Sequence, residues 1–181
     1  MRIVEAKSIG TSEKTSYTSL FHAKLQIMIR ISIAEQMLYH RDAAGVWMRY
    51  PISTASKGAG NQRDSFQTPL GKHRICNKIG ANMPMMTAFR AREPIQIYKH
   101  GNDNPKQDWI LTRILWLGGM QTGINKRGKV DTHSRYIYIH GTHDEAHIGT
   151  PVSHGCIRML NQDMLHLFER CRLGESVYIR R

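Results

Sequence analysis

Residues 136–159 read YIYIHGTHDEAHIGTPVSHGCIRM, and this stretch decides both the fold and the candidate chemistry. It opens on a run of tyrosine and isoleucine that ends at His140, and it closes on Ser153-His-Gly-Cys156. Runs of aromatic and β-branched residues are typical of strands. The pattern therefore predicts a short strand over 136–140 that leads directly to His140, followed by a turn that carries Cys156.

Cys156 is the candidate nucleophile of this stretch. A thiol attacks a carbonyl carbon only as the thiolate, and a free cysteine is mostly protonated at neutral pH. It therefore needs a base, a positive field, or both. His140 and His154 are both candidates for that base, and His154 lies so close in the chain that it is the less obvious partner. Residue types alone also allow an inert, buried cysteine beside two hydrogen-bonded histidines.

Two neighbours of the cysteine suit acyl transfer. Gly155 allows the backbone an unusual conformation, and backbone N–H groups at such a turn are natural donors to the oxyanion of a tetrahedral intermediate. Arg158 lies on the same side as Cys156 if the segment is extended, where a guanidinium could bind a substrate carboxylate.

The flanking sequence predicts a mostly β domain. Ile27, Ile29 and Ile31 alternate with polar residues, as a strand with one buried face requires. The helix expected after the motif begins at Asn161 or Gln162 and ends before Gly174. Residues 80–105 are expected to be irregular because three prolines interrupt them. The other strands are predicted at 25–33, 36–40, 46–52, 72–79, 109–117 (ended by Gly118-Gly119) and 176–179.

Composition sets the broad class. The 181 residues fit one domain over 24–181. Residues 1–23, rich in Ser, Thr and Lys, are expected to form a mobile extension. The net charge of +12 favours an anionic partner or substrate. The N-terminal residues hold no apolar run of the kind that a secretory signal contains, so a cytoplasmic location is expected; a removed signal or a different start codon would make it periplasmic.

The motifs resemble those of the YkuD-type L,D-transpeptidases, in which HGT is followed by IG-x-P-x-SHGCIRM. Ser53-Thr54 and Thr68-Pro69-x-Gly71 resemble the family's ST-G…TP-G region, and the similarity runs over about 25–179. The resemblance implies a compact, sandwich-like β domain with one prominent helix after the motif. It also implies roles: Cys156 as nucleophile, His140 as its activating base, Gly141 as the carbonyl that orients His140, His154 and Gly155 as the oxyanion turn, and Ser153 and Arg158 as substrate contacts.

The activity implied by the resemblance is acyl transfer on peptidoglycan stem peptides. The thiolate attacks the carbonyl at the L-centre of the third residue, usually diaminopimelate, and expels D-Ala. Water as acceptor gives an L,D-carboxypeptidase that trims muropeptides, which the expected cytoplasmic location favours; an amine gives 3-3 cross-links or attaches proteins to the wall. Acylation of Cys156 by carbapenems is a further expectation. We expect no cofactor and no membrane contact.

Two other interpretations have less support. His143, Asp144, Glu145 and His147 lack a fixed metal-binding spacing, so we expect a polar loop and no metal there. A basic nucleic-acid-binding module would use the +12 charge, but the sequence has no recognisable binding motif and that function would leave SHGC unexplained. Arg127, Lys129 and Arg135 could flank the cleft, although solvated surface is the favoured expectation for them.

Overall fold

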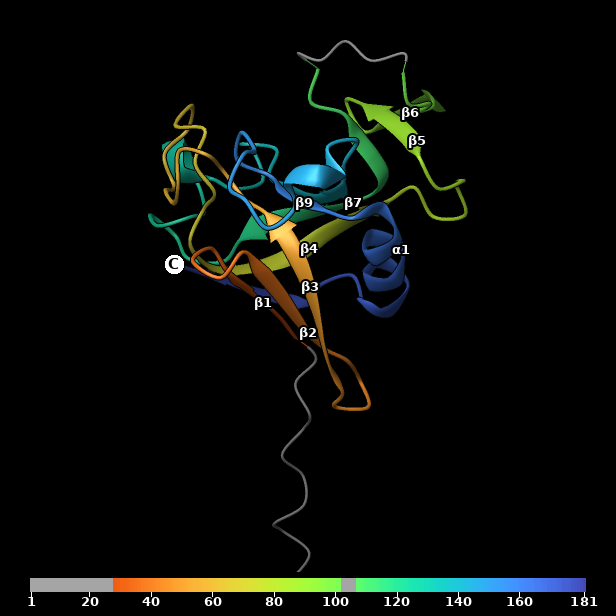
Figure 1. Ribbon diagram of the computed structural model, residues 1–181. Helices are drawn as coiled ribbons and strands as arrows, with labels where there is room; N and C mark the ends of the chain where they lie inside the picture. The colour runs from red at the N-terminus through yellow and green to blue at the C-terminus, as the bar shows by residue number, and fades with distance from the viewer. Residues whose placement is uncertain (1–27, 102–106) are drawn as a thin grey trace, which may run out of the picture.

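The computed structural model describes residues 28–101 and 107–181. The extension expected at 1–23 and the first residues of the strand expected at 25–33 lie outside these ranges. Within them, ten strands form one sheet (Figure 1). The strands are β1 (Met28–Ser32), β2 (Met37–Arg41), β3 (Trp47–Ser53), β4 (Gly71–Ile79), β5 (Thr87–Arg90), β6 (Glu93–Ile97), β7 (Ile110–Gly119), β8 (Tyr138–Gly141), β9 (Ile157–Met159) and β10 (Ser176–Arg180).

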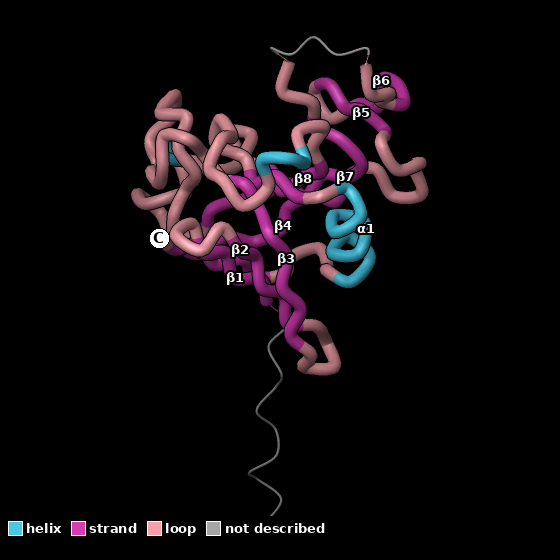
Figure 2. The backbone as a smooth tube through the Cα atoms, viewed as in Figure 1, coloured by secondary structure: helices cyan, strands magenta, loops and turns pink. Residues whose placement is uncertain are grey.

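The sheet closes on itself. Its order is β4-β10-β1-β2-β3-β9-β8-β7-β5-β6, and β4 also pairs with β7. The eight strands from β4 to β7 therefore form a closed ladder, and the β5–β6 hairpin extends from β7. Most of the loops lie on one side of the sheet, in the upper part of the view (Figure 2). A closed ladder leaves few unpaired strand edges.

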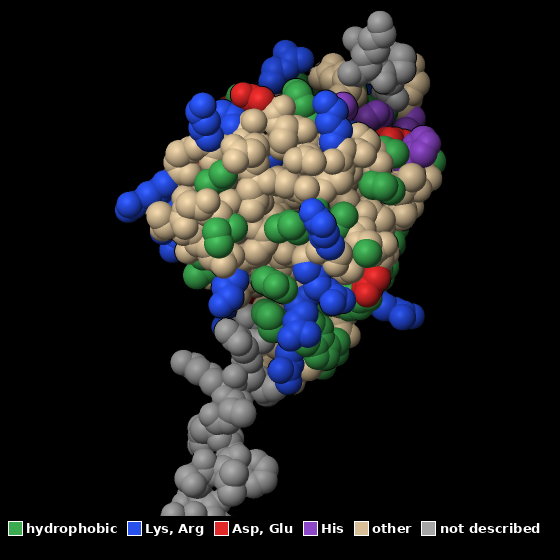
Figure 3. All heavy atoms as spheres, turned by 90° about the vertical axis from the view of Figure 1, so that its left-hand side faces the viewer, with side chains coloured by type: hydrophobic (Ala, Val, Ile, Leu, Met, Phe, Trp, Pro, Cys, Tyr) green, Lys and Arg blue, Asp and Glu red, His purple; other side chains and the backbone are tan. Residues whose placement is uncertain are grey.

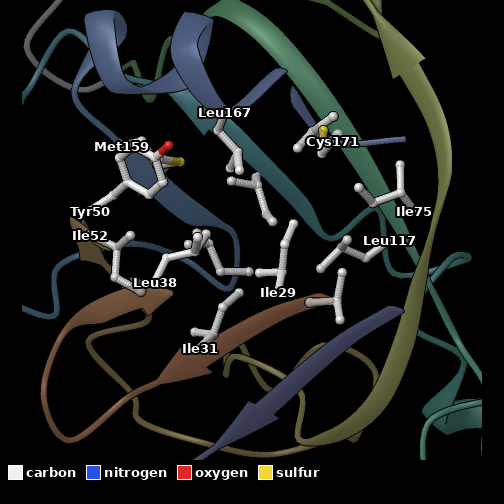
Figure 4. Packing of buried hydrophobic residues seen from close by; sticks show 14 of the residues in the cluster. Ile29, Ile31, Leu38, Tyr50, Ile52, Ile75, Leu117, Met159, Leu167 and Cys171 are labelled. Atoms are coloured by element: carbon white, nitrogen blue, oxygen red, sulfur yellow. The ribbon is translucent and has the colours of Figure 1, made fainter. Parts of the chain in front are cut away.

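The core lies inside this curved sheet, where α1 (Asn161–Arg170) covers it (Figure 4). Ile29 and Ile31 of β1 are fully buried, whereas Arg30 between them is exposed, as the alternation predicts. From α1, Met164, Leu167 and Phe168 join the same cluster. Each such side chain contributes about 1.5–3 kcal/mol when it is fully buried. The predictions of a mostly β domain and of one prominent helix after the motif are confirmed.

The helix begins on a side chain from another segment. Leu160 precedes α1 and makes no side-chain cap, but a carboxylate oxygen of Glu145 accepts a hydrogen bond from the Asn161 backbone N–H at 2.7 Å. A carboxylate is favourable at this end of a helix. Glu145 belongs to η2 (Glu145–His147), in the loop between β8 and β9, so this contact fixes that loop against α1.

The irregular segment expected over 80–105 is wrong, because it contains β5 and β6. Pro94 lies within β6, which is the last strand of the sheet. An outermost strand needs no N–H donor on its free side, and proline is tolerated there. The sequence also gave no signal for β9, a strand of three residues.

The strand break expected at Gly118-Gly119 is also wrong, because β7 continues through both residues. Gly119 pairs with His73 of β4. A Cβ atom at Gly119 would lie 1.8 Å from the carbonyl oxygen of Asn125. The glycine is therefore needed for close packing of two backbone segments, and not for a turn. Similarly, Gly174 lies in a turn beyond α1, which ends at Arg170, and is not its C-terminal cap.

Candidate active site

The site is built on two adjacent parallel strands. β8 and β9 pair in register, with His140 opposite Arg158 and Ile139 opposite Ile157. The two isoleucines point into the core. Because side chains alternate along a strand, His140 and Arg158 lie together on the other face. Cys156 directly precedes β9 and packs against Tyr138 on this same face.

The sulfur atom of Cys156 is held by backbone groups of the tyrosine-rich segment. The Tyr138 N–H donates to Sγ at 3.4 Å, and Sγ lies 3.5 Å from the carbonyl oxygen of Tyr136. The side chain is partly buried and packs against a small cluster that also contains Phe89 and Ile114. The thiol is thus fixed at the boundary between an apolar wall and the surface.

The turn before the cysteine is fixed by its own serine. Ser153 Oγ donates to the Cys156 carbonyl at 2.6 Å and accepts the Gly155 N–H at 3.2 Å. The Thr68 hydroxyl donates to the Gly155 carbonyl at 3.1 Å, so the TP-G region supports the turn from outside. Gly155 has φ +132°, a conformation that side chains with a Cβ rarely adopt. In this state the Gly155 N–H is already bonded, and its role toward an oxyanion stays a prediction.

His140 is buried and oriented by the residue after it. Its Nδ1 lies 2.8 Å from the Gly141 carbonyl oxygen. A carbonyl only accepts hydrogen bonds, so Nδ1 carries the hydrogen and Nε2 is the nitrogen able to take a proton. Burial lowers the pKa of His140, although Asp108 and the Gly141 carbonyl act to raise it. The ring is therefore neutral at rest, as a general base must be.

Cys156 is a thiol and not a thiolate in this resting site. Burial raises its pKa to about 12, and the nearby charge of Asp108 adds to that effect. The Tyr138 N–H, Arg158 and Arg135 act in the opposite direction. The site therefore holds a neutral thiol and a neutral imidazole, so the proton must leave the sulfur when substrate is attacked.

Asp108 is a site residue that the sequence did not indicate. Its Oδ2 lies 2.6 Å from Arg158 Nη2 and 3.3 Å from His154 Nδ1. Arg158 also pairs with Asp144: its Nη1 lies 3.6 Å from Asp144 Oδ2. Burial alone would raise the pKa of Asp108, but His140 and Arg158 lower it overall. No local pattern could reveal this residue, because it is 48 positions from Cys156 in the chain.

These contacts bear on the roles predicted for Arg158 and His154. Arg158 is 5% exposed and already paired with two carboxylates, so its guanidinium is not free for a substrate carboxylate. The His154 side chain is 69% exposed, and its hydrogen-bond partner is Asp108. His140 is buried in contrast, and its role as the base stays a prediction.

The polar loop at 143–147 has structural partners. Asp144 contacts His147 at 2.5 Å as well as Arg158, and Glu145 caps α1. Over 28–101 and 107–181, no group of three or more His, Cys, Asp or Glu side chains could hold a metal ion. Across those same ranges, no helix has the length and apolar character needed to cross a membrane.

Fold and site together define a β-rich domain that presents a cysteine and a buried histidine from neighbouring strand ends, which is the arrangement of a cysteine acyl-transfer domain. The model of the YkuD family, the L,D-transpeptidase catalytic domain, matches residues 26–179. The chain belongs to this family.

Curated relatives support the assignment over shorter segments. The putative L,D-transpeptidase YqjB of Bacillus subtilis (strain 168) is 41% identical over 63 residues, which is 35% of this chain and 34% of that protein. The probable L,D-transpeptidase YbiS of Escherichia coli (strain K12) is 46% identical over 43 residues, 24% of this chain and 14% of that protein. The chain thus aligns with a third or less of these relatives.

Solved structures show the same fold. L,D-transpeptidase 3 from Mycobacterium tuberculosis, in complex with a faropenem-derived adduct, has a TM-score of 0.54 at 16% identity, over 86% of this chain and 60% of that one. LdtMt1 in complex with imipenem has a TM-score of 0.51 at 16% identity, over 85% of this chain and 58% of that one.

Proposed function

We propose that this domain cleaves the bond between the L-centre of diaminopimelate and D-Ala in peptidoglycan stem peptides, through a thioacyl enzyme at Cys156. The observation that carries the proposal is the placement of Cys156 and His140 on one face of β8 and β9, with the His140 ring held by the Gly141 carbonyl. Family membership supports the substrate class.

The first step moves one proton and exchanges one bond. His140 Nε2 takes the proton of the Cys156 thiol as the sulfur bonds to the carbonyl carbon. When the tetrahedral intermediate collapses, the C–N bond to D-Ala breaks and the imidazolium returns the proton to the leaving amine. A second nucleophile then attacks the thioester and gives its proton to His140. The C–S bond breaks, and the imidazolium returns the proton to the Cys156 sulfur.

For the second nucleophile we favour water, which makes the protein an L,D-carboxypeptidase acting on muropeptides in the cytoplasm. The site itself serves either acceptor, and the experiment below separates them. The alternative acceptor is an amine of a second stem, which gives a 3-3 cross-link or attaches a protein to the wall.

Incubation of the purified protein with disaccharide tetrapeptide, followed by mass spectrometry, tests the proposal. Disaccharide tripeptide with free D-Ala supports hydrolysis, and cross-linked dimers support transfer to an amine. Cys156→Ala is the matched control. The proposal fails if the wild-type protein gives no product, or if Cys156→Ala gives as much.

Carbapenem acylation gives a second readout of the same nucleophile. Since relatives have been solved with a faropenem-derived adduct and with imipenem, we propose that Cys156 is acylated as well. Intact mass after incubation with imipenem should rise by the mass of the drug in the wild-type protein and stay unchanged in Cys156→Ala.

A further inference from the structure

Stem peptides carry several carboxylates, and Arg158 cannot serve them in this state because Asp108 and Asp144 already pair with it. Displacing both would leave two partly buried carboxylates without their cation, facing each other and the substrate. If the proposed function holds, on which this inference rests, the protein needs another cation close to Cys156.

A pocket of about 440 Å³ is lined by residues of segments that adjoin Cys156. Its lining includes Arg63, Phe66, Arg135, Tyr136 and His154. Tyr136, one of these residues, has its carbonyl oxygen 3.5 Å from Cys156 Sγ, so the pocket adjoins the segment that holds the sulfur. Arg135 is close enough for its charge to act on the Cys156 thiol. Arg135, expected to be solvated surface, is therefore part of the site.

Arg135 is a fixed, half-buried cation. Its guanidinium donates to the carbonyl oxygens of Gln67 at 2.6 Å and Gly60 at 3.1 Å. In the described part of the chain, no carboxylate oxygen lies within 4.0 Å of it, so its charge is not neutralised by an ion pair. Arginine held in this way is well suited to a planar anion.

Arg63 adds a second guanidinium to the same pocket. The segments that carry the two arginines lie side by side (left in Figure 1), joined by the Arg63 N–H to the Lys129 carbonyl at 2.7 Å. Arg63 Nη2 donates to Ser134 Oγ at 3.0 Å, and no ion pair of Arg63 is found among the described residues. Asp64 also lines the pocket, so it holds two cations and one anion.

The surroundings favour an anion with an apolar stem. Lys57 Nζ lies 4.9 Å from the centre of the Phe66 ring, which adds another positive charge at the rim. Phe66 and Tyr136 are about half exposed and offer aromatic walls. On this side of the molecule, Lys and Arg side chains are spread over the surface and acidic ones are few (Figure 3).

We propose that this pocket binds a carboxylate of the stem peptide, with Arg63 and Arg135 as its ionic partners. Such a carboxylate belongs to the second residue, to the distal end of diaminopimelate, or to the terminal D-Ala. The charge of the bound group decides which stem peptides are cleaved, so the pocket is a specificity site for acidic over amidated stems.

The test compares kcat/KM for D-Ala release from the free-acid tetrapeptide with three substrates, each amidated at one of these carboxylates. Loss of a hydrogen bond to a charged group costs about tenfold in kcat/KM. We expect one amide to be cleaved about tenfold more slowly than the free acid by the wild-type enzyme. The position of the amide in that slowly cleaved substrate identifies the carboxylate that the pocket binds.

Arg63→Gln should lower kcat/KM for the free acid by a similar factor. It should leave kcat/KM for the slowly cleaved amide unchanged, so that the enzyme no longer prefers the acid over that amide. Arg135→Lys, which keeps the charge but not the fork of donors, should reduce the preference in part. Arg49→Gln, an exposed arginine on β3, is the matched control and should keep it. Alkylation of Cys156 by neutral iodoacetamide at the wild-type rate shows that the variants remain folded at the site.

The outcomes separate this proposal from the function itself. If no substrate releases D-Ala, the proposed function is wrong. If D-Ala is released at equal rates from the acid and all three amides, or if Arg63→Gln slows every substrate equally, the cleavage stands and the carboxylate pocket does not exist.

Discussion

Asp108 bridges two residues of the SHGC segment: one of its carboxylate oxygens lies 2.6 Å from Arg158 Nη2 and 3.3 Å from His154 Nδ1. The same charge raises the pKa of the Cys156 thiol and acts to raise that of His140. A single acidic side chain therefore adds to the effect of burial on the Cys156 thiol while it pairs with Arg158.

Asp108→Asn should make Cys156 more reactive toward small electrophiles. Removal of the negative charge lowers the pKa of the thiol, because one of the two causes that raise it is lost while burial remains, and more thiolate is present at a given pH. We expect iodoacetamide to alkylate Cys156 about threefold faster or more at constant pH. Peptide mapping by mass spectrometry separates Cys156 from Cys76 and Cys171. Glu93→Gln, on the outermost strand, is the control, and an unchanged or slower rate in Asp108→Asn would contradict the prediction.

The choice between the two histidines can be tested by acylation. His140→Gln should slow the reaction of Cys156 with imipenem by about 100-fold or more, because the buried general base is lost. His154→Gln should change the rate by less than about threefold, because the ring is exposed and bonds to Asp108. Stopped-flow absorbance or intact mass against time gives both rates. Comparable losses in the two variants would place His154 in the proton transfer.

Stability should fall with acid because of His73. Burial lowers the pKa of this ring to about 4, whereas an unfolded histidine has a pKa of 6.5. Between these values the unfolded chain binds a proton that the folded chain does not. The contribution of His73 to the free energy of unfolding is therefore fully present above pH 6.5 and is lost as the pH falls toward 4. The contribution is about 3 kcal/mol at most. Urea unfolding of His73→Gln should show a flatter pH dependence than wild type, whereas His154→Gln should follow wild type.

Gly119→Ala should destabilise the fold. The added Cβ would meet the Asn125 carbonyl, and the strand cannot move away because it pairs with both β4 and β8. We expect a loss of about 2 kcal/mol or more in the free energy of unfolding. Met120→Ala, at the next and half-exposed position, should cost less than about 0.5 kcal/mol. Equal midpoints in urea for the two variants would show that the backbone contact relaxes.

The features that sequence predicts well here are those that repeat locally. The alternation in β1 and the apolar face of α1 each depend on neighbours within a few residues, and both appear where expected. In contrast, β6 contains a proline that is acceptable only because nothing pairs with its outer side. Gly119 is needed within the strand because the Asn125 backbone, which belongs to the following turn, packs directly against it.

The same division holds in the site. Cys156 and His140 belong to one continuous motif, and the structure brings their strands together. Asp108 and Arg135 act on the Cys156 thiol from two other segments, and Arg63 reaches the pocket beside it from a third, so tertiary contacts bring them together. Arg158 lies opposite His140 on β8, and its charge is paired with Asp108 and Asp144, partners that are set by tertiary contacts.

The parallel pairing of β1 with β10 has a mechanical consequence. Met28 lies opposite Ser176 and Ser32 opposite Arg180, so the chain enters the pair at one end and leaves it at the other. A force that pulls on residues before β1 and after β10 acts along both strands in opposite directions. It loads the hydrogen bonds of the whole ladder in shear at the same time, and does not open them one by one. The domain should therefore resist stretching between its two ends far more strongly than its equilibrium stability alone would suggest.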